Sequence, residues 1–268
     1  MIKRLLKHAT AQRGALLRDN KAHILAHDYA FQIYGANSIY SMVPKNACST
    51  MRLSIAIGNG AIRDDNEANF IHANNHTFKP SLRELMESGY AFIILRCPYS
   101  RLASCFLDKF MRESAPVTHY LEVMTEDFRL GATSFKSFCA SLIGHNVLRA
   151  DIHWRPQTDF LVFDSYDDYF CVERLKQAIP IIETKTGLKI VDARNITQHG
   201  LDTVELRPAD EMHAETTLRQ HRRMRRNGQA VHPKSLYDEE TREMVKEIFA
   251  EDFALFDALF PGCQLFDL

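Results

Sequence analysis

A lysine and two adjacent hydroxylic residues follow a short apolar stretch in the first fifth of the chain. Lys45 and the pair Ser49-Thr50 lie in the segment 38–52, where apolar residues lead into a loop of small residues. Lys45 supplies a positive charge, and the residues from Asn46 to Thr50 supply the backbone N–H groups that open a helix and attract anions. The segment predicts a strand, a phosphate-binding loop and a helix. The Walker pattern is absent, which argues against an ordinary P-loop kinase.

A second strand-loop-helix pattern occupies residues 92–110. An apolar run before Arg96 predicts a buried strand, and Pro98 suits the first position of a helix. The carboxyl ends of parallel strands are where open α/β sheets bind ligands, and arginine suits bidentate contact with phosphate. We therefore expect Arg96 and Ser104 to converge on one phosphate. The apolar face of the expected helix comprises Leu102, Phe106 and Phe110.

Both patterns resemble motifs of the carbohydrate sulfotransferases, which use the donor 3′-phosphoadenosine 5′-phosphosulfate (PAPS). Pro44-Lys45 with Ser49-Thr50 is similar to their 5′-phosphosulfate loop, and Arg96-x-Pro98-x-x-Arg101-Leu102-x-Ser104 is similar to their 3′-phosphate motif. The similar group includes the HNK-1 and chondroitin sulfotransferases, the heparan 2-O-sulfotransferases and bacterial proteins. The segments His153-Trp154-Arg155-Pro156-Gln157 and 237–256 also resemble elements of this group, so the resemblance spans about residues 38 to 258.

The resemblance implies PAPS as the donor, the bisphosphate PAP as the product, and no metal. Sulfuryl transfer then requires a donor cradle, neutralisation of charge on the leaving phosphate, and a base for the acceptor hydroxyl. Lys45 is expected to face the bridging oxygen as a catalytic cation. The predicted donor-binding residues are Lys45, Asn46, Ala47, Cys48, Ser49, Thr50, Arg96 and Ser104.

A histidine suits the role of base because its unperturbed pKa lies near the working pH. The related 2-O-sulfotransferases carry their catalytic histidine between the two phosphate motifs. His72 is predicted to end a strand in this interval, and His76 in the following loop is its rival. His153 is expected to orient the donor or the acceptor. Trp154, the only tryptophan, is either a core anchor or a face for stacking on a sugar.

Five arginines fall within the eight residues Arg219–Arg226. This basic run is either a solvated helix surface or a contact for a phosphate or an anionic glycan. A nucleic-acid site is disfavoured, because no aromatic platform accompanies the run and the chain carries a net charge of −1.

Composition favours one α/β domain over residues 1–268, with an N-terminal arm at 1–36 and a core at 37–268. The chain is 46% hydrophobic and 25% charged, so it can bury one large core. The resemblance implies a P-loop-like fold, with a central, mostly parallel sheet flanked by helices. The six cysteines form no C-x-x-C pair, which predicts reduced thiols and neither a disulfide scaffold nor a zinc site.

Several local elements can be placed from their patterns. Ser81-x-x-Glu84 predicts a capping box and a short helix. Asp238 is expected to cap the last long helix. Other predicted elements are a first strand near Ser38, helices at 118–143 and 168–179, and a strand at 160–163.

No secretory signal and no membrane-length apolar run is evident, so no stable membrane insertion is expected and a cytoplasmic, bacterial protein is favoured. The predicted function is PAPS-dependent sulfuryl transfer to a hydroxyl of a carbohydrate or glycan. The alternatives are a nucleotide-dependent kinase with an atypical phosphate loop and a non-catalytic nucleotide- or glycan-binding protein.

Overall fold

The computed structural model describes residues 4–9, 16–74, 76–112, 115–124, 129–143, 146–193 and 204–267. The chain separates into two compact units, one comprising residues 1–95 and 157–198 and the other residues 96–156 and 199–268. The assignment of one domain over 1–268, with an arm at 1–36, stays a prediction.

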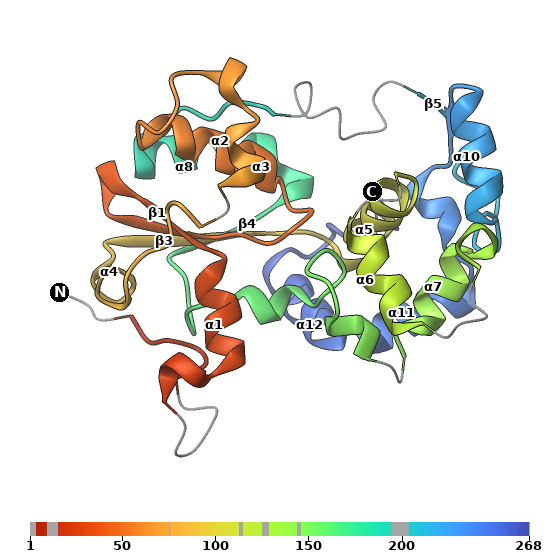
Figure 1. Cartoon of the computed structure of the whole chain (residues 1–268), viewed down its shortest axis with the longest axis horizontal. Helices are drawn as coiled ribbons and strands as arrows, with labels where there is room; N and C mark the ends of the chain where they lie inside the picture. Colours follow the sequence, from red (N-terminus) through yellow and green to blue (C-terminus); the bar gives the residue numbers. More distant parts are fainter. Residues whose placement is uncertain are drawn as a thin grey trace. The chain divides into compact units, whose positions relative to one another are not determined.

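The first unit is built on a four-stranded mixed sheet in the order β1-β2-β3-β4 (Figure 1). The strands are β1 (Ala30–Ile33), β2 (Ser38–Ser41), β3 (Tyr90–Leu95) and β4 (Asp168–Cys171). β1 runs antiparallel to β2, whereas β2 and β4 both pair in parallel with β3. The α/β class, the strand at Ser38 and the parallel pairing of the two motif strands are confirmed.

The helices of the first unit cover both faces of this sheet. They are α1 (Lys21–Asp28), α2 (Cys48–Gly58), α3 (Phe70–Ala73), α4 (Leu82–Glu87) and α8 (Leu175–Thr186). α2 and α8 lie on one face and α1 on the other (Figure 1). All residues of β1, β2 and β3 are buried, as expected for strands covered on both faces. The predicted capping box at Ser81 is confirmed.

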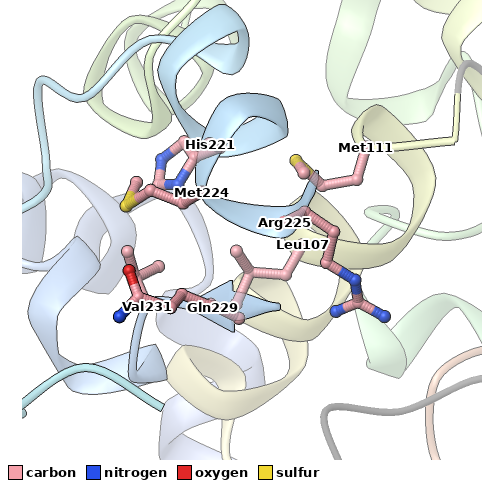
Figure 2. Close-up of a pocket in the computed structure, with 8 residues that line it drawn as sticks. Leu107, Met111, His221, Met224, Arg225, Gln229 and Val231 are labelled. Atoms are coloured by element: carbon pink, nitrogen blue, oxygen red, sulfur yellow. The ribbon is translucent and has the colours of Figure 1, made fainter. Parts of the chain in front are cut away.

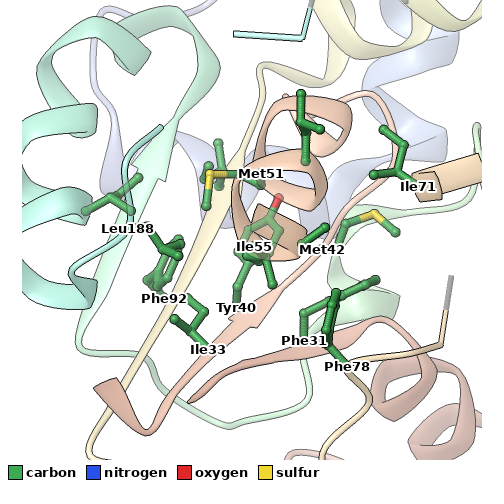
Figure 3. Close-up of a cluster of buried hydrophobic side chains, with 14 of the residues drawn as sticks. Phe31, Ile33, Tyr40, Met42, Met51, Ile55, Ile71, Phe78, Phe92 and Leu188 are labelled. Carbon is green, nitrogen blue, oxygen red and sulfur yellow. The ribbon is translucent and has the colours of Figure 1, made fainter. Parts of the chain in front are cut away.

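The core under α2 is shown in Figure 3. Tyr40 of β2 and Phe92 of β3 are fully buried, and their rings stack with centroids 5.1 Å apart. Met51 and Ile55 of α2 belong to the same cluster. Because one side of α2 is buried in this cluster, the helix start at Cys48 is held at the carboxyl end of β2.

The second unit is mainly helical. Its elements are α5 (Pro98–Cys105), a π-helical segment (Phe106–Phe110), α6 (Ala115–Val123), α7 (Phe135–Ser141), α10 (Leu218–Arg226), α11 (Glu239–Ile248), α12 (Ala250–Leu259), and the short parallel strands β5 (Glu205–Leu206) and β6 (Gln229–Ala230). Pro98 occupies the first turn of α5, and Leu102, Phe106 and Phe110 are buried, as predicted. The Asp238 cap is confirmed, since its side chain accepts the N–H of Thr241.

The strand predicted at 160–163 is wrong, and the helix predicted at 168–179 is wrong over 168–171 but confirmed from Leu175 onward. Residues 160–163 are buried but form only an isolated bridge, between Phe163 and Leu6: Gln157–Phe160 is a 3-10 helix, and Lys7 donates its N–H to the carbonyl of Val162. The strand beside β3 is instead β4, at the start of the predicted helix, and α8 begins only at Leu175. Residues 168–171 form a strand because β3 offers them a partner, and pairing with a distant strand overrides local preference.

Three further boundaries differ from expectation. In the described part of the interval 118–143, the end of α6, the 3-10 helix Leu130–Ala132 and α7 take the place of one helix. The last predicted helix is divided at Phe249 into α11 and α12. The strand at Ser38 is not the first, because β1 lies within residues 1–36 and pairs with it.

Candidate functional site

The loop between β2 and α2 has an unusual backbone. Lys45 and Ala47 adopt left-handed conformations, with φ of 73° and 55°. Such conformations cost about 1–3 kcal/mol for residues other than glycine and occur preferentially at functional sites. Ala47 directly precedes the first helical residue, Cys48, and alternation of left- and right-handed residues turns successive N–H groups toward one concave side that suits an anion. Lys45 and the residues Ala47 to Ser49 are half-buried.

Asn46 holds this loop from inside the first unit. Its side chain is fully buried, and Nδ2 donates to the carbonyl of Ile94 at 3.0 Å and to Oε1 of Gln157 at 2.6 Å. Its backbone N–H donates to the carbonyl of Val43. The side chain of Asn46 therefore holds the loop between β3 and the Gln157 segment, and its role as a donor ligand stays a prediction.

We predict that Asn46→Ala lowers the free energy of unfolding by about 1–3 kcal/mol, because two buried acceptors lose their donor. Urea unfolding measures the change, and Asn66→Ala on the exposed surface is the control. A double-mutant cycle with Gln157→Ala tests the contact itself and should give a coupling energy of about 0.5–3 kcal/mol. Additive effects of the two substitutions would show that the bond contributes nothing to stability.

The hydroxyl groups of α2 differ in their surroundings. Thr50 is buried, and its Oγ1 accepts the N–H of Ala193 at 3.2 Å. Ser54, one turn later, donates to the carbonyl of Thr50 and accepts the N–H of Val191. These bonds attach the segment 190–193 to α2. Of the two predicted hydroxyl ligands, Ser49 is therefore the more accessible.

In the second unit, the other predicted phosphate ligands are Arg96, just before α5, and Ser104, within α5. Within residues 91–106, Arg96 and Ser104 are half-buried and every other residue is buried. Arg96 follows the end of β3 at Leu95, and Ser104 lies in the last turn of α5. The two residues that the sequence assigns to a phosphate are thus the accessible ones in this stretch.

Arg101 of the same motif has a different role. It is 2% exposed, and its guanidinium donates to the carbonyls of Arg155 at 2.7 Å and Ile152 at 3.3 Å. Trp154, which lies between those two residues, is fully buried and donates its indole N–H to the carbonyl of Val147. Trp154 is therefore a core anchor and offers no face for a sugar.

The predicted bases His72 and His76 are both exposed. The expectation that His72 ends a strand is wrong, because Phe70–Ala73 is the short helix α3, with Ile71 buried and His72 on the outer side. The buried residues Ala68 and Ile71 are three positions apart, which is the spacing of a helix. The apolar pair Phe70-Ile71 before His72 is therefore a misleading indication of a strand. The catalytic roles of His72 and His76 stay predictions.

Sequence reasoning missed a carboxylate next to His153. Asp151 is 7% exposed, and its Oδ1 lies 2.6 Å from Nδ1 of His153. Oδ2 lies 2.9 Å from Nδ1 of His119. The spacing Asp-x-His was a usable local signal, because an aspartate often accepts the N–H two residues later, as Asp151 does here.

The basic run forms most of α10. Arg219, Arg223 and Arg226 are exposed on one side, and the buried Leu218 and His221 face the other. The helix dipole favours cations only in the last turn, so it does not explain Arg219 in the first. Like charges three or four residues apart destabilise a helix by about 0.2–0.5 kcal/mol per pair. This exposed arginine face therefore costs the helix stability.

A small pocket in the second unit lies between α10, β6 and the π-helical segment (Figure 2). His221 lines it, and burial lowers the pKa of that imidazole to about 4, so the ring is neutral at pH 7. None of the predicted donor ligands lines this pocket. The other residues around it are Leu107, Met111, Met224, Arg225, Gln229, Ala230 and Val231.

Other site types find little support in the described part of the chain. It contains no cluster of histidine, cysteine and carboxylate side chains suited to a metal ion. None of the six cysteines, all of which the structure describes, forms a disulfide. No helix among the described residues has the length and apolar character needed to cross a membrane.

The structure thus defines an α/β protein with a strained loop and a helix start at the carboxyl end of a parallel strand. The chain belongs to the sulfotransferase family, whose model matches residues 36–260 and so includes both phosphate motifs. This confirms the family resemblance and indicates a transferase of sulfuryl groups. No match was found among curated proteins or among solved structures.

Proposed function

We propose that this protein transfers a sulfuryl group from PAPS to a hydroxyl of a carbohydrate or glycan and releases PAP. The observation that carries the proposal is the loop from Met42 to Ala47, in which two residues other than glycine are left-handed immediately before a helix start. Strain of this kind persists where the surrounding structure enforces it. Here the buried Asn46 supplies that constraint.

The proposed donor contacts divide by chemistry. Lys45 and the N–H groups at the start of α2 suit the 5′-phosphosulfate, because they concentrate positive charge at one point. Ser49 adds a half-buried hydroxyl. Arg96 and Ser104 suit the 3′-phosphate, since both remain accessible in a stretch that is otherwise buried. No metal is needed for these contacts.

Lys45 has the further role of stabilising the leaving group. During transfer, the acceptor oxygen forms a bond to sulfur while the bond from sulfur to the bridging phosphate oxygen breaks. Negative charge then grows on that phosphate oxygen, and a fixed ammonium group there lowers the barrier. The acceptor proton passes to a base.

The carbohydrate acceptor rests on the resemblance of the sequence to carbohydrate sulfotransferases. The exposed arginine face of α10 supports an acceptor that carries anionic groups, because its exposed guanidinium groups suit carboxylates or sulfates. No nucleic acid is expected as partner.

Calorimetry with PAP and with ATP tests the donor class. A sulfotransferase should bind PAP and strongly prefer it to ATP, because only PAP carries the 3′-phosphate. Preference for ATP would favour the kinase alternative. Incubation with ³⁵S-labelled PAPS and a panel of desulfated chondroitin, heparosan and simple glycosides then tests turnover. PAP binding without transfer to any acceptor would favour a non-catalytic binding protein.

A further inference from the structure

The side chain of Asp151 is clamped between two histidines in the second unit. Its Oδ1 accepts from both the backbone N–H and Nδ1 of His153, at 2.9 and 2.6 Å, and Oδ2 accepts from Nδ1 of His119 at 2.9 Å. Burial acts to raise the pKa of Asp151, but the hydrogen bonds and charge of His153, helped by His119, hold that pKa below its ordinary value. The carboxylate is therefore ionised at neutral pH.

This contact decides which ring nitrogen of His153 is basic. An ionised carboxylate only accepts hydrogen bonds, so Nδ1 of His153 must carry the proton that it donates. In a neutral imidazole the lone pair then resides on Nε2. A carboxylate on Nδ1 also stabilises the imidazolium that forms when Nε2 takes a proton. The His153 side chain is 21% exposed, so the ring is not sealed in the core.

His153 is also held in place more firmly than the other candidate histidines. The carbonyls of Ile152 and Arg155, on either side of it, accept hydrogen bonds from the guanidinium of Arg101 of α5, and the neighbouring Trp154 is fully buried. The same helix carries Ser104 and follows Arg96. His72, in contrast, is exposed on the four-residue helix α3. A base needs a fixed position, which favours His153.

We propose that His153, oriented by Asp151, is the general base of sulfuryl transfer; this proposal rests on the function proposed above. The acceptor hydroxyl transfers its proton to Nε2 of His153 as its oxygen bonds to sulfur. The sulfur–oxygen bond to the donor phosphate breaks, and its electron pair remains on the phosphate. Asp151 acts through the imidazole and is a positioning residue.

The first test determines which ring nitrogen of His153 carries the proton, and it does not depend on enzymatic activity. ¹⁵N NMR of the imidazole nitrogens at neutral pH should show His153 protonated on Nδ1 and unprotonated on Nε2. In Asp151→Asn the amide can still accept the backbone N–H of His153, but its NH₂ group can donate to Nδ1 and favour the opposite tautomer. A wild-type His153 protonated on Nε2 would overturn the proposal.

The second test compares variants in kinetics, with the acceptor that the wild type sulfates in the labelled-PAPS panel. His153→Gln should lower kcat by roughly 10²–10⁴-fold while leaving PAP affinity and the thermal melting temperature nearly unchanged. His119→Gln is the matched control, because it removes the other histidine on the same carboxylate and should be mild. Asp151→Asn should lower kcat more than it changes either KM.

The outcomes separate the two proposals. A His153→Gln enzyme that keeps its kcat, or a dead His119→Gln or His72→Gln enzyme beside an active His153→Gln enzyme, would overturn the base role alone. Absence of PAP binding by the wild type would instead overturn the sulfotransferase function proposed above, and the base role with it.

Discussion

Replacing Lys45 with alanine should lower kcat by about 10²–10³-fold and change the affinity for PAP much less. Loss of one preorganised charge-stabilising group typically has this effect, because its interaction is strongest when the leaving group is fully charged. Steady-state kinetics with PAPS and calorimetry with PAP measure the two quantities.

Two further variants show whether the loss of kcat comes from the missing charge of Lys45 or from a change in backbone conformation. Lys45→Gly removes the ammonium group but also relieves the left-handed strain at φ 73°, so it should be more stable than Lys45→Ala and equally slow. Lys176→Ala removes an exposed lysine of α8 and should keep full activity. A Lys45→Ala enzyme with normal kcat and weakened PAP binding would assign Lys45 to ground-state binding only.

Arg96→Ala should weaken PAP binding by about 1–3 kcal/mol, or roughly 5- to 150-fold, because a charged phosphate loses a charged donor. Ser104→Ala should have a smaller effect in the same direction, since its hydroxyl is neutral. Calorimetry measures both, and the folded state of each variant is checked by thermal melting.

The comparison of PAP with 5′-AMP makes this prediction specific. AMP lacks the 3′-phosphate, so its affinity should be nearly the same for the wild type and for both variants. Arg219→Ala, which removes an exposed arginine of α10, should leave PAP affinity unchanged. Equal loss of PAP and AMP affinity in Arg96→Ala would contradict the 3′-phosphate assignment and indicate a general effect on the site.

Local sequence determined the elements that carry the candidate ligands. The apolar run of β3 followed by Pro98 predicts a strand and a helix start, and both are present. Capping residues Ser81 and Asp238 likewise mark helix starts that the structure contains. These signals work because a cap bonds to the N–H two or three residues later and Pro fixes its own φ. None of these signals depends on a residue that is distant in the sequence.

Tertiary structure alone decided how the loop is held and which histidine has a fixed ring. The contact of Asn46 with Gln157 spans 111 residues, and Arg101 reaches the carbonyl of Arg155 54 residues away. β4 is a strand because β3 offers it a partner along its whole length, whereas of the buried residues 160–163 only Phe163 is paired, in an isolated bridge with Leu6. The spacing of apolar residues predicts which residues are buried, but it does not predict which distant group a buried residue contacts. The contacts of Asn46 and Arg101 therefore could not be predicted from local sequence.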